Sequence, residues 1–144
     1  MCIRDSGWRT SNELVPSVKQ ALIDEDPRVR RVACESLRHM DATVSLEQIA
    51  DILASTSPTE AMSARRLLEI QTIDQWRDQV LEHDNTRVFM QGATALMIVE
   101  PELENSYRIL ARCSSIMDEF VSDSDFVGLL RVVQLALDLS LIHI

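Results

Sequence analysis

The chain has 144 residues, a formal net charge of −9 and only 3 Gly and 4 Pro. So few turn-forming residues exclude a multistranded sheet, whereas abundant Leu, Ala, Arg and Glu favour an all-α domain of ordinary size. The acidic balance argues against nucleic acid and anionic lipid as partners, because like charges repel. No apolar run approaches the roughly 18 residues of a membrane span.

The two ends of the chain have an unusual coding origin. Codons for Met1–Ser6 and Leu139–Ile144 can be written as reverse complements, and both strings resemble the transposase end sequence used to build sequencing libraries. We therefore expect residues 1–6 and 139–144 to be adapter-derived tails, and residues 7–138 to be an internal helical domain of a longer protein. The natural N-terminus then lies outside the sequence, so the cellular compartment stays open.

Apolar residues recur every three or four positions, which is the spacing of a helix face that packs on a core. In chain order the stripes run through Leu14–Leu22, Val29–Met40, Leu46–Leu53, Ala61–Leu68, Ile73–Val80, Val88–Val99, Tyr107–Phe120 and Phe126–Leu139. They predict about eight short helices joined by tight connections. The seventh has two apolar sides, one with Tyr107 and Leu110 and the other with Ile109, Cys113 and Phe120.

Capping residues mark the starts of these helices. Asp26 offers an N-cap, followed by Pro27 in the first helical position, where the missing N–H has no cost. Ser57 and Glu60 have the spacing of a capping box, in which the Glu60 side chain reaches back to the Ser57 amide. The same spacing occurs in Ser45 with Gln48, Thr72 with Gln75 and Ser122 with Asp125.

Three of the helices share one pattern, which indicates an internal repeat. The segments Asp26–Leu37, Ser57–Leu68 and Asn85–Leu96 align without gaps. Each has a small residue followed one turn later by Leu: Ala33 and Leu37, Ala64 and Leu68, and Gly92 and Leu96. A small residue lets a neighbouring helix approach closely, and the Leu fills the space beside it.

The first copy, with the sequence ALIDEDPRVRRVACESL from Ala21 to Leu37, resembles a HEAT repeat. The resemblance lies in the acidic turn before Pro27 and in the Val29-Arg30 pair, together with the small and Leu positions. It implies a right-handed α-α superhelix, or α-solenoid, of about four antiparallel helix pairs.

The HEAT resemblance also implies a ladder of Asp and Arg side chains along the stack. Asp24 or Asp26 would join it together with Arg30. The second and third copies have Glu60-Ala61 and Val88-Phe89 where the family has Val-Arg. We therefore extend the solenoid fold to them, but not the ladder.

Solenoids of this type bind partners along a concave surface built from the second helix of each pair. Here these helices contain Arg30, Arg65 and Arg87, which form our candidate partner-binding face. The expected function is a non-catalytic scaffold for protein–protein interaction, with a protein or an acidic peptide as the partner. We expect no cofactor, no metal and no catalytic residue, and the oligomeric state stays open.

A fainter resemblance supports an alternative. The segments TRVFMQGATAL (residues 86–96) and SDFVGLLRVVQLAL (residues 124–137) are similar to helical-repeat regions of large secreted bacterial proteins that carry c-type haem. The chain would then be a structural module of a haem-binding or dehydrogenase-associated protein, although the C-x-x-C-H attachment motif is absent. A bilin-lyase-like enzyme lacks a chromophore-handling constellation, and the acidic balance disfavours a HEAT-type nucleic-acid enzyme.

Several polar side chains have a structural explanation that competes with a chemical one. His39 and His83 lie near predicted helix ends, where a cation gains roughly 0.3–1 kcal/mol, so we favour a capping role over a metal site. Asp123-Ser124-Asp125 suggests a calcium loop, but the required ligand positions are occupied by Val127 and Gln134, so we favour a helix N-cap.

The remaining candidates are also assigned to the core or to the surface. We expect Cys34 and Cys113 to be free buried thiols rather than a disulfide, and Trp76 to be a core residue. The arginine cluster of Arg28, Arg30, Arg31 and Arg38 is expected to be a solvated, internally paired face, because five acidic residues surround it. These neighbours are Asp24, Glu25, Asp26, Glu35 and Asp41.

The last apolar stripe, Phe126–Leu139, is apolar on nearly every side. Such a helix needs cover all round, and a following repeat would supply it. We therefore expect an exposed apolar surface there and self-association of the isolated chain.

Overall fold

The computed structural model describes the backbone of residues 3–142 and the side chains of residues 12–142. This part of the chain contains eight α-helices, two short 3₁₀ helices and no strand, so the predicted all-α class is confirmed. The α-helices are α1 (Ile3–Gln20), α2 (Pro27–His39), α3 (Leu46–Leu53), α4 (Pro58–Glu69), α5 (Arg77–Leu81), α6 (Thr86–Val99), α7 (Leu103–Met117) and α8 (Asp123–Ile142). The 3₁₀ helices are η1 (Ala21–Ile23) and η2 (Ile73–Gln75). Within residues 3–142, no helix has both the length and the apolar character needed to span a lipid bilayer.

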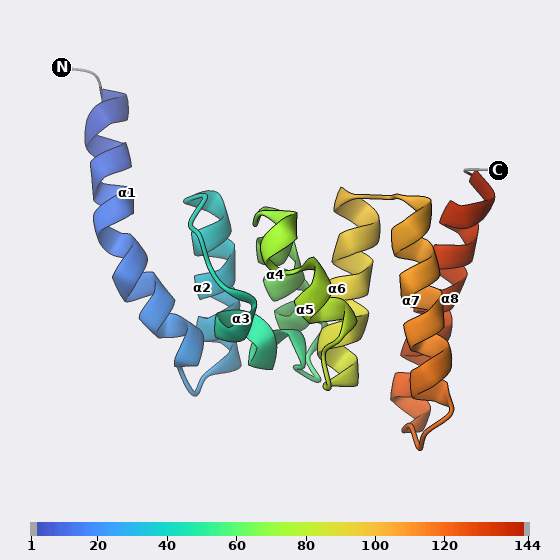
Figure 1. Cartoon of the computed structure of the whole chain (residues 1–144). Helices are drawn as coiled ribbons and strands as arrows, with labels where there is room; N and C mark the ends of the chain where they lie inside the picture. Colours follow the sequence, from blue (N-terminus) through green and yellow to red (C-terminus); the bar gives the residue numbers. More distant parts are fainter. Residues whose placement is uncertain (1–2, 143–144) are drawn as a thin grey trace.

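The helices form an elongated row, with α1 at one end and α7 and α8 at the other (Figure 1). Helix α2 contacts α4, α4 contacts α6, and α6 contacts α8. The three helices that share the aligned pattern therefore lie side by side in chain order. Helix α3 packs on α4 and α6, while α5 packs on α6 and α7.

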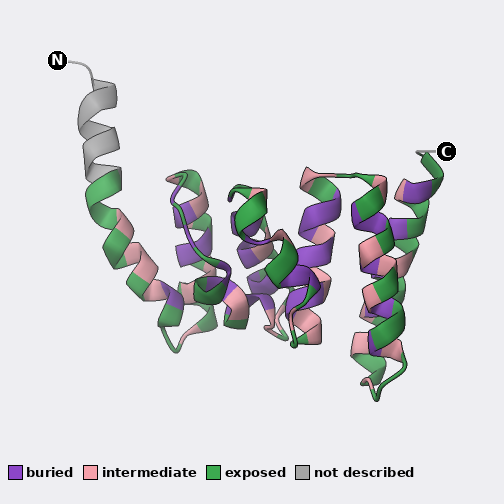
Figure 2. Cartoon of the chain, in the orientation of Figure 1, coloured by how far each residue is buried: buried purple, intermediate pink, exposed green. Residues whose placement is uncertain are grey.

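The core runs along the sides where these helices meet (Figure 2). All three pairs of aligned small and Leu positions are buried: Ala33 and Leu37, Ala64 and Leu68, and Gly92 and Leu96. Trp76 is only 2% exposed, which confirms its prediction as a core residue. The repeated sequence pattern therefore marks core positions in all three helices.

Most of the predicted caps form. The Asp26 carboxylate accepts a hydrogen bond from the Arg28 amide, and Pro27 begins α2. Ser45 and Gln48 make both hydrogen bonds of a capping box. At the start of α8, the Ser122 hydroxyl accepts from the Asp125 amide, so this acidic segment is a helix N-terminus as predicted.

Two predicted caps are wrong. The Ser57 amide donates to the Ser55 hydroxyl, because the Glu60 side chain turns away from it and pairs with Arg30 on the neighbouring helix. Thr72 makes no side-chain cap, and a 3₁₀ helix follows it. At Glu60, a contact with another helix thus overrides a local sequence pattern.

Some apolar positions also differ from the predicted stripes. Val29 and Val32 are exposed, because they line a groove between α1 and α2 that neither helix fills. Helix α7 turns Ile109 and Cys113 to the core, whereas Phe120 lies beyond the end of the helix and is 99% exposed. Of the expected adapter-derived tails, residues 3–6 lie in α1 and residues 139–142 in α8, while residues 1, 2, 143 and 144 lie outside the described residues.

Gly92 permits the close approach of α6 to α5. A Cβ atom at this position would lie 2.0 Å from Val80 Cγ1 and 2.8 Å from Val80 Cβ. Val80 is fully buried and branched at Cβ, so it has no free space into which to turn. At Gly128 the added atom would instead meet the flexible end of Met90, with Sδ at 2.7 Å.

We expect Gly92→Ala to lower the free energy of unfolding by about 1–2 kcal/mol, because the overpacking cost exceeds the gain in helix propensity. The matched control is Gly128→Ala, which is expected to be neutral or to stabilise by up to about 1 kcal/mol, since Met90 can swing aside. Urea denaturation of both variants measures the difference. Equal stability changes in the two variants would show that α5 and α6 are not packed this closely.

Helix α8 leaves a broad apolar surface uncovered. It buries Leu129, Val132 and Ala136 against the rest of the row. A second stripe of large apolar side chains faces solvent: Val127, Leu130, Leu137 and Leu141. The exposed surface expected from the sequence is therefore present, and apolar area of this kind drives association.

We expect the chain to self-associate as its concentration rises and to bind the dye ANS, because the exposed stripe of α8 is removed from water by association. The double substitution Leu130→Gln and Leu137→Gln removes two side chains that are each 47% exposed. It should shift the sedimentation profile towards monomer without loss of helicity. A monodisperse native monomer that does not bind ANS would contradict this expectation.

Candidate functional site

The three arginines of the candidate partner-binding face lie on α2, α4 and α6, and each of them is held by an acidic side chain. Arg30 pairs with Glu60 of α4, Arg65 with Glu69 of its own helix, and Arg87 with Asp125 of α8. No single groove brings the three arginines together in the described part of the chain. A shared binding role for them stays a prediction.

The pair of Arg30 and Glu60 joins α2 to α4 in a mostly buried setting. Arg30 Nε donates to Glu60 Oε1 at 2.6 Å, and the Ser55 hydroxyl donates to Glu60 Oε2 at 2.6 Å. Arg30 Nη1 also donates to the main-chain oxygens of Asp24 and Glu25, at 2.7 and 3.1 Å. The predicted ladder contact between Arg30 and Asp24 is thus made to the main-chain carbonyl oxygen of Asp24 and not to its carboxylate. The carboxylate that pairs with Arg30 belongs to Glu60 on α4.

Glu60 is kept ionised by this arrangement. Burial opposes its ionisation, but the hydrogen bonds from Arg30 and Ser55 prevail, and the pKa of Glu60 lies below its ordinary value. Because the folded-state pKa is lowered, the contribution of Glu60 to stability is complete above the ordinary carboxyl pKa. It is lost as the pH falls through the lowered value.

Two further pairs tie neighbouring helices together. Arg87 Nε on α6 donates to Asp125 Oδ1 at the start of α8, at 3.0 Å. Arg77 at the start of α5 pairs with Glu100, which also accepts a hydrogen bond from Asn105. The hydrogen bond from Asn105, followed by that from Arg77, holds the pKa of Glu100 below its ordinary value against the effect of burial. Arg77 and Arg87 therefore have a structural role in holding neighbouring helices together.

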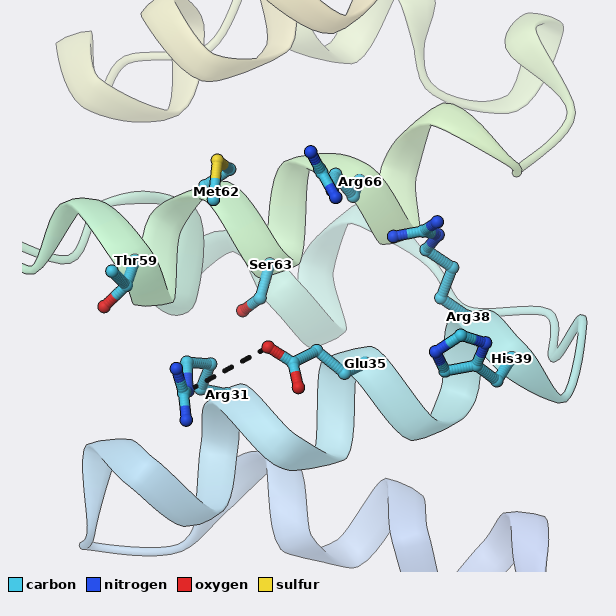
Figure 3. A pocket seen from close by; sticks show the side chains of 8 residues that line it. All are labelled: Arg31, Glu35, Arg38, His39, Thr59, Met62, Ser63 and Arg66. Atoms are coloured by element: carbon cyan, nitrogen blue, oxygen red, sulfur yellow. Dashed lines mark ion pairs between the residues drawn. The ribbon is translucent and has the colours of Figure 1, made fainter.

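A groove between α2 and α4 holds a different set of charges. All its lining residues come from these two helices, and its volume is about 360 Å³. The charged and titratable residues are Arg31, Glu35, Arg38, His39 and Arg66, and the others are Thr59, Met62 and Ser63. Figure 3 shows Arg38 and Arg66 near one end of the groove, and Arg31 near the other end beside Thr59.

The arginines of this groove are only weakly engaged. Arg31 Nε lies 3.9 Å from Glu35 Oε1, which is too long for a hydrogen bond, and both side chains are more than two-fifths exposed, at 42% and 49%. Within residues 12–142, the guanidinium groups of Arg38 and Arg66 take part in no ion pair and no hydrogen bond. The predicted pairing of the arginine cluster with its acidic neighbours therefore holds for Arg28 with Asp26 and, at longer range, for Arg31 with Glu35. Arg30 instead pairs with Glu60 of α4, and Arg38 has no ion pair within the described residues.

The two cysteines are free and buried, as predicted. Burial raises the pKa of each thiol to about 11, so both are protonated at neutral pH. A protonated thiol is a poor nucleophile and a poor metal ligand. Cys34 and Cys113 thus behave as small core residues.

Both histidines lie near the C-terminal ends of helices, as the sequence predicted. His39 is in the last turn of α2, next to Arg38. His83 follows α5, and its Nδ1 accepts a hydrogen bond from the Asn85 amide at 3.0 Å. No three His, Cys, Asp or Glu side chains converge into a metal-ligand group among the residues that the structure describes.

No family model, curated protein or solved structure matches the chain.

We expect Arg30→Met to lower the free energy of unfolding by about 3 kcal/mol, because it leaves the Glu60 carboxylate buried without its cation. Arg28→Met is the matched control, since the Arg28 side chain is 87% exposed and should contribute less than about 0.5 kcal/mol. Urea denaturation measures both variants.

A double variant separates the pair from simple loss of packing. Arg30→Met combined with Glu60→Met removes the stranded charge and should recover most of the lost stability. If the single and double variants are equally destabilised, the buried carboxylate is not the cause.

Proposed function

We propose that the chain is a non-catalytic protein-interaction module of HEAT-like repeats, folded as an α-solenoid and belonging to a longer protein. One observation carries the proposal: helices α2, α4 and α6 share a sequence pattern and contact one another in chain order, and the small and Leu positions of the pattern are buried in all three helices. Stacking of equivalent units through nearest-neighbour contacts is the property that defines a solenoid.

The chemistry of the side chains supports a binding role. The carboxylates with lowered pKa values, Glu60 and Glu100, are both occupied by arginines that support the helix packing. The thiols are buried and protonated. The surface of the row carries open grooves between neighbouring helices and connecting segments, with volumes of about 360 to 490 Å³ each. Grooves of this kind accept side chains of a partner.

Selection of ligands from a random peptide library displayed on phage tests the proposed function directly. The immobilised chain should enrich peptides rich in Asp and Glu, whereas an unrelated helical protein of similar net charge serves as the control. If no peptide is enriched over the control protein, the interaction function fails.

The contribution of the predicted arginine face is tested separately. Arg65→Gln is the suitable change, because the ion pair of Arg65 with Glu69 lies within α4 and does not join two helices. The selected peptides should bind the variant several-fold more weakly if Arg65 belongs to the binding face. Unchanged affinity would remove Arg65 from it.

A further inference from the structure

We propose that the groove between α2 and α4 binds an acidic segment of a partner polypeptide. If the chain is an interaction module, as proposed above, this groove determines both the place of binding and the chemistry of the partner. Three arginines face one carboxylate here, in a chain whose formal net charge is −9. The groove is thus locally positive on an acidic protein.

The free guanidinium groups are the first support for this assignment. Elsewhere in the row, Arg30, Arg77 and Arg87 each hold a carboxylate of another element. Arg38 and Arg66 lie near the same end of the groove and have no such partner within the described residues (Figure 3). Two guanidinium forks at one place match the two oxygens of a carboxylate, which can accept several N–H donors at once.

Arg31 supplies a second anchoring point. Its Nε is shielded from solvent and makes no hydrogen bond, although the Glu35 carboxylate lies nearby. A buried N–H without an acceptor costs free energy, and a carboxylate entering the groove supplies the missing acceptor. The exposed Glu35 is free to turn away when a partner carboxylate binds.

The spacing of these anchors defines the partner more closely. Arg31 and Arg38 are two turns apart on α2, a distance of about 10 Å along the helix. In an extended polyproline II segment, side chains three residues apart share one face and are separated by about 9 Å. A segment with acidic residues at every third position therefore fits both ends of the groove.

A polypeptide fits this site better than a nucleic acid. A phosphate backbone carries charge along its whole length, so it would extend past the groove over the acidic surface of the chain. A short acidic segment needs no positive charge outside the groove. Met62 adds an exposed, flexible apolar contact of the kind that accommodates peptide side chains.

The experiment uses the whole chain and a fluorescein-labelled peptide of repeated Glu-Ser-Ser units, with affinity measured by fluorescence anisotropy. The groove variant is Arg38→Gln with Arg66→Gln. The matched control is Arg28→Gln with Arg131→Gln, which changes the net charge equally at two exposed positions on α2 and α8. We expect the groove variant to lose at least about tenfold in affinity and the control less than about twofold. Circular dichroism confirms that both variants remain helical.

Four outcomes would overturn the assignment. Equal losses in the two double variants would mean that only net charge matters, and equal binding of a Gln-Ser-Ser peptide would mean that carboxylates are not recognised. Tighter binding of a single-stranded oligonucleotide than of the Glu-Ser-Ser peptide would assign the groove to nucleic acid. If the native chain ignores the Glu-Ser-Ser peptide but enriches other peptides from the library, the groove assignment fails while the interaction function stands.

Discussion

The close packing of α2, α4 and α6 is the constraint on which the rest of the structure depends. The small residues Ala33 and Ala64 are buried in this packing. On α6, Gly92 also brings α5 so near that a single added carbon atom would overlap Val80. When helices pack this closely, some polar side chains beside the contact face the neighbouring helix and are removed from water. Charged residues at these positions then need partners, which explains why Glu60 is buried yet ionised beside Arg30.

Much of this arrangement was predictable from the sequence, because it rests on local patterns. The apolar spacing identified the helices, and the aligned small and Leu positions identified buried core positions, as Ala64 and Leu68 show. Asp26 and Ser45 could be recognised as caps because an N-cap depends on residues within one turn. Burial of Cys34 followed from its place on the core side of a helix stripe.

The parts that could not be predicted depend on residues far apart in the sequence. Glu60 has a cap-box spacing, but its real partner is Arg30 on another helix, and nothing local to Ser57 reveals this choice. The groove was missed for the same reason, since Arg66 completes it from α4. A weak signal existed: Arg31 and Arg38 are seven residues apart and so share one helix face. Only the packing of α2 beside α4 shows that Arg66 lines the same groove as Arg31 and Arg38.

In the proposed mode of binding, the packing of α2 beside α4 creates the site for an acidic partner. Amide chemical shifts of the isotope-labelled chain, followed while the Glu-Ser-Ser peptide is added, test it most directly. We expect the largest shifts in residues 31–39 and 59–66, with α8 unaffected. Shifts concentrated in α8, or spread evenly over the whole row, would contradict this mode of binding.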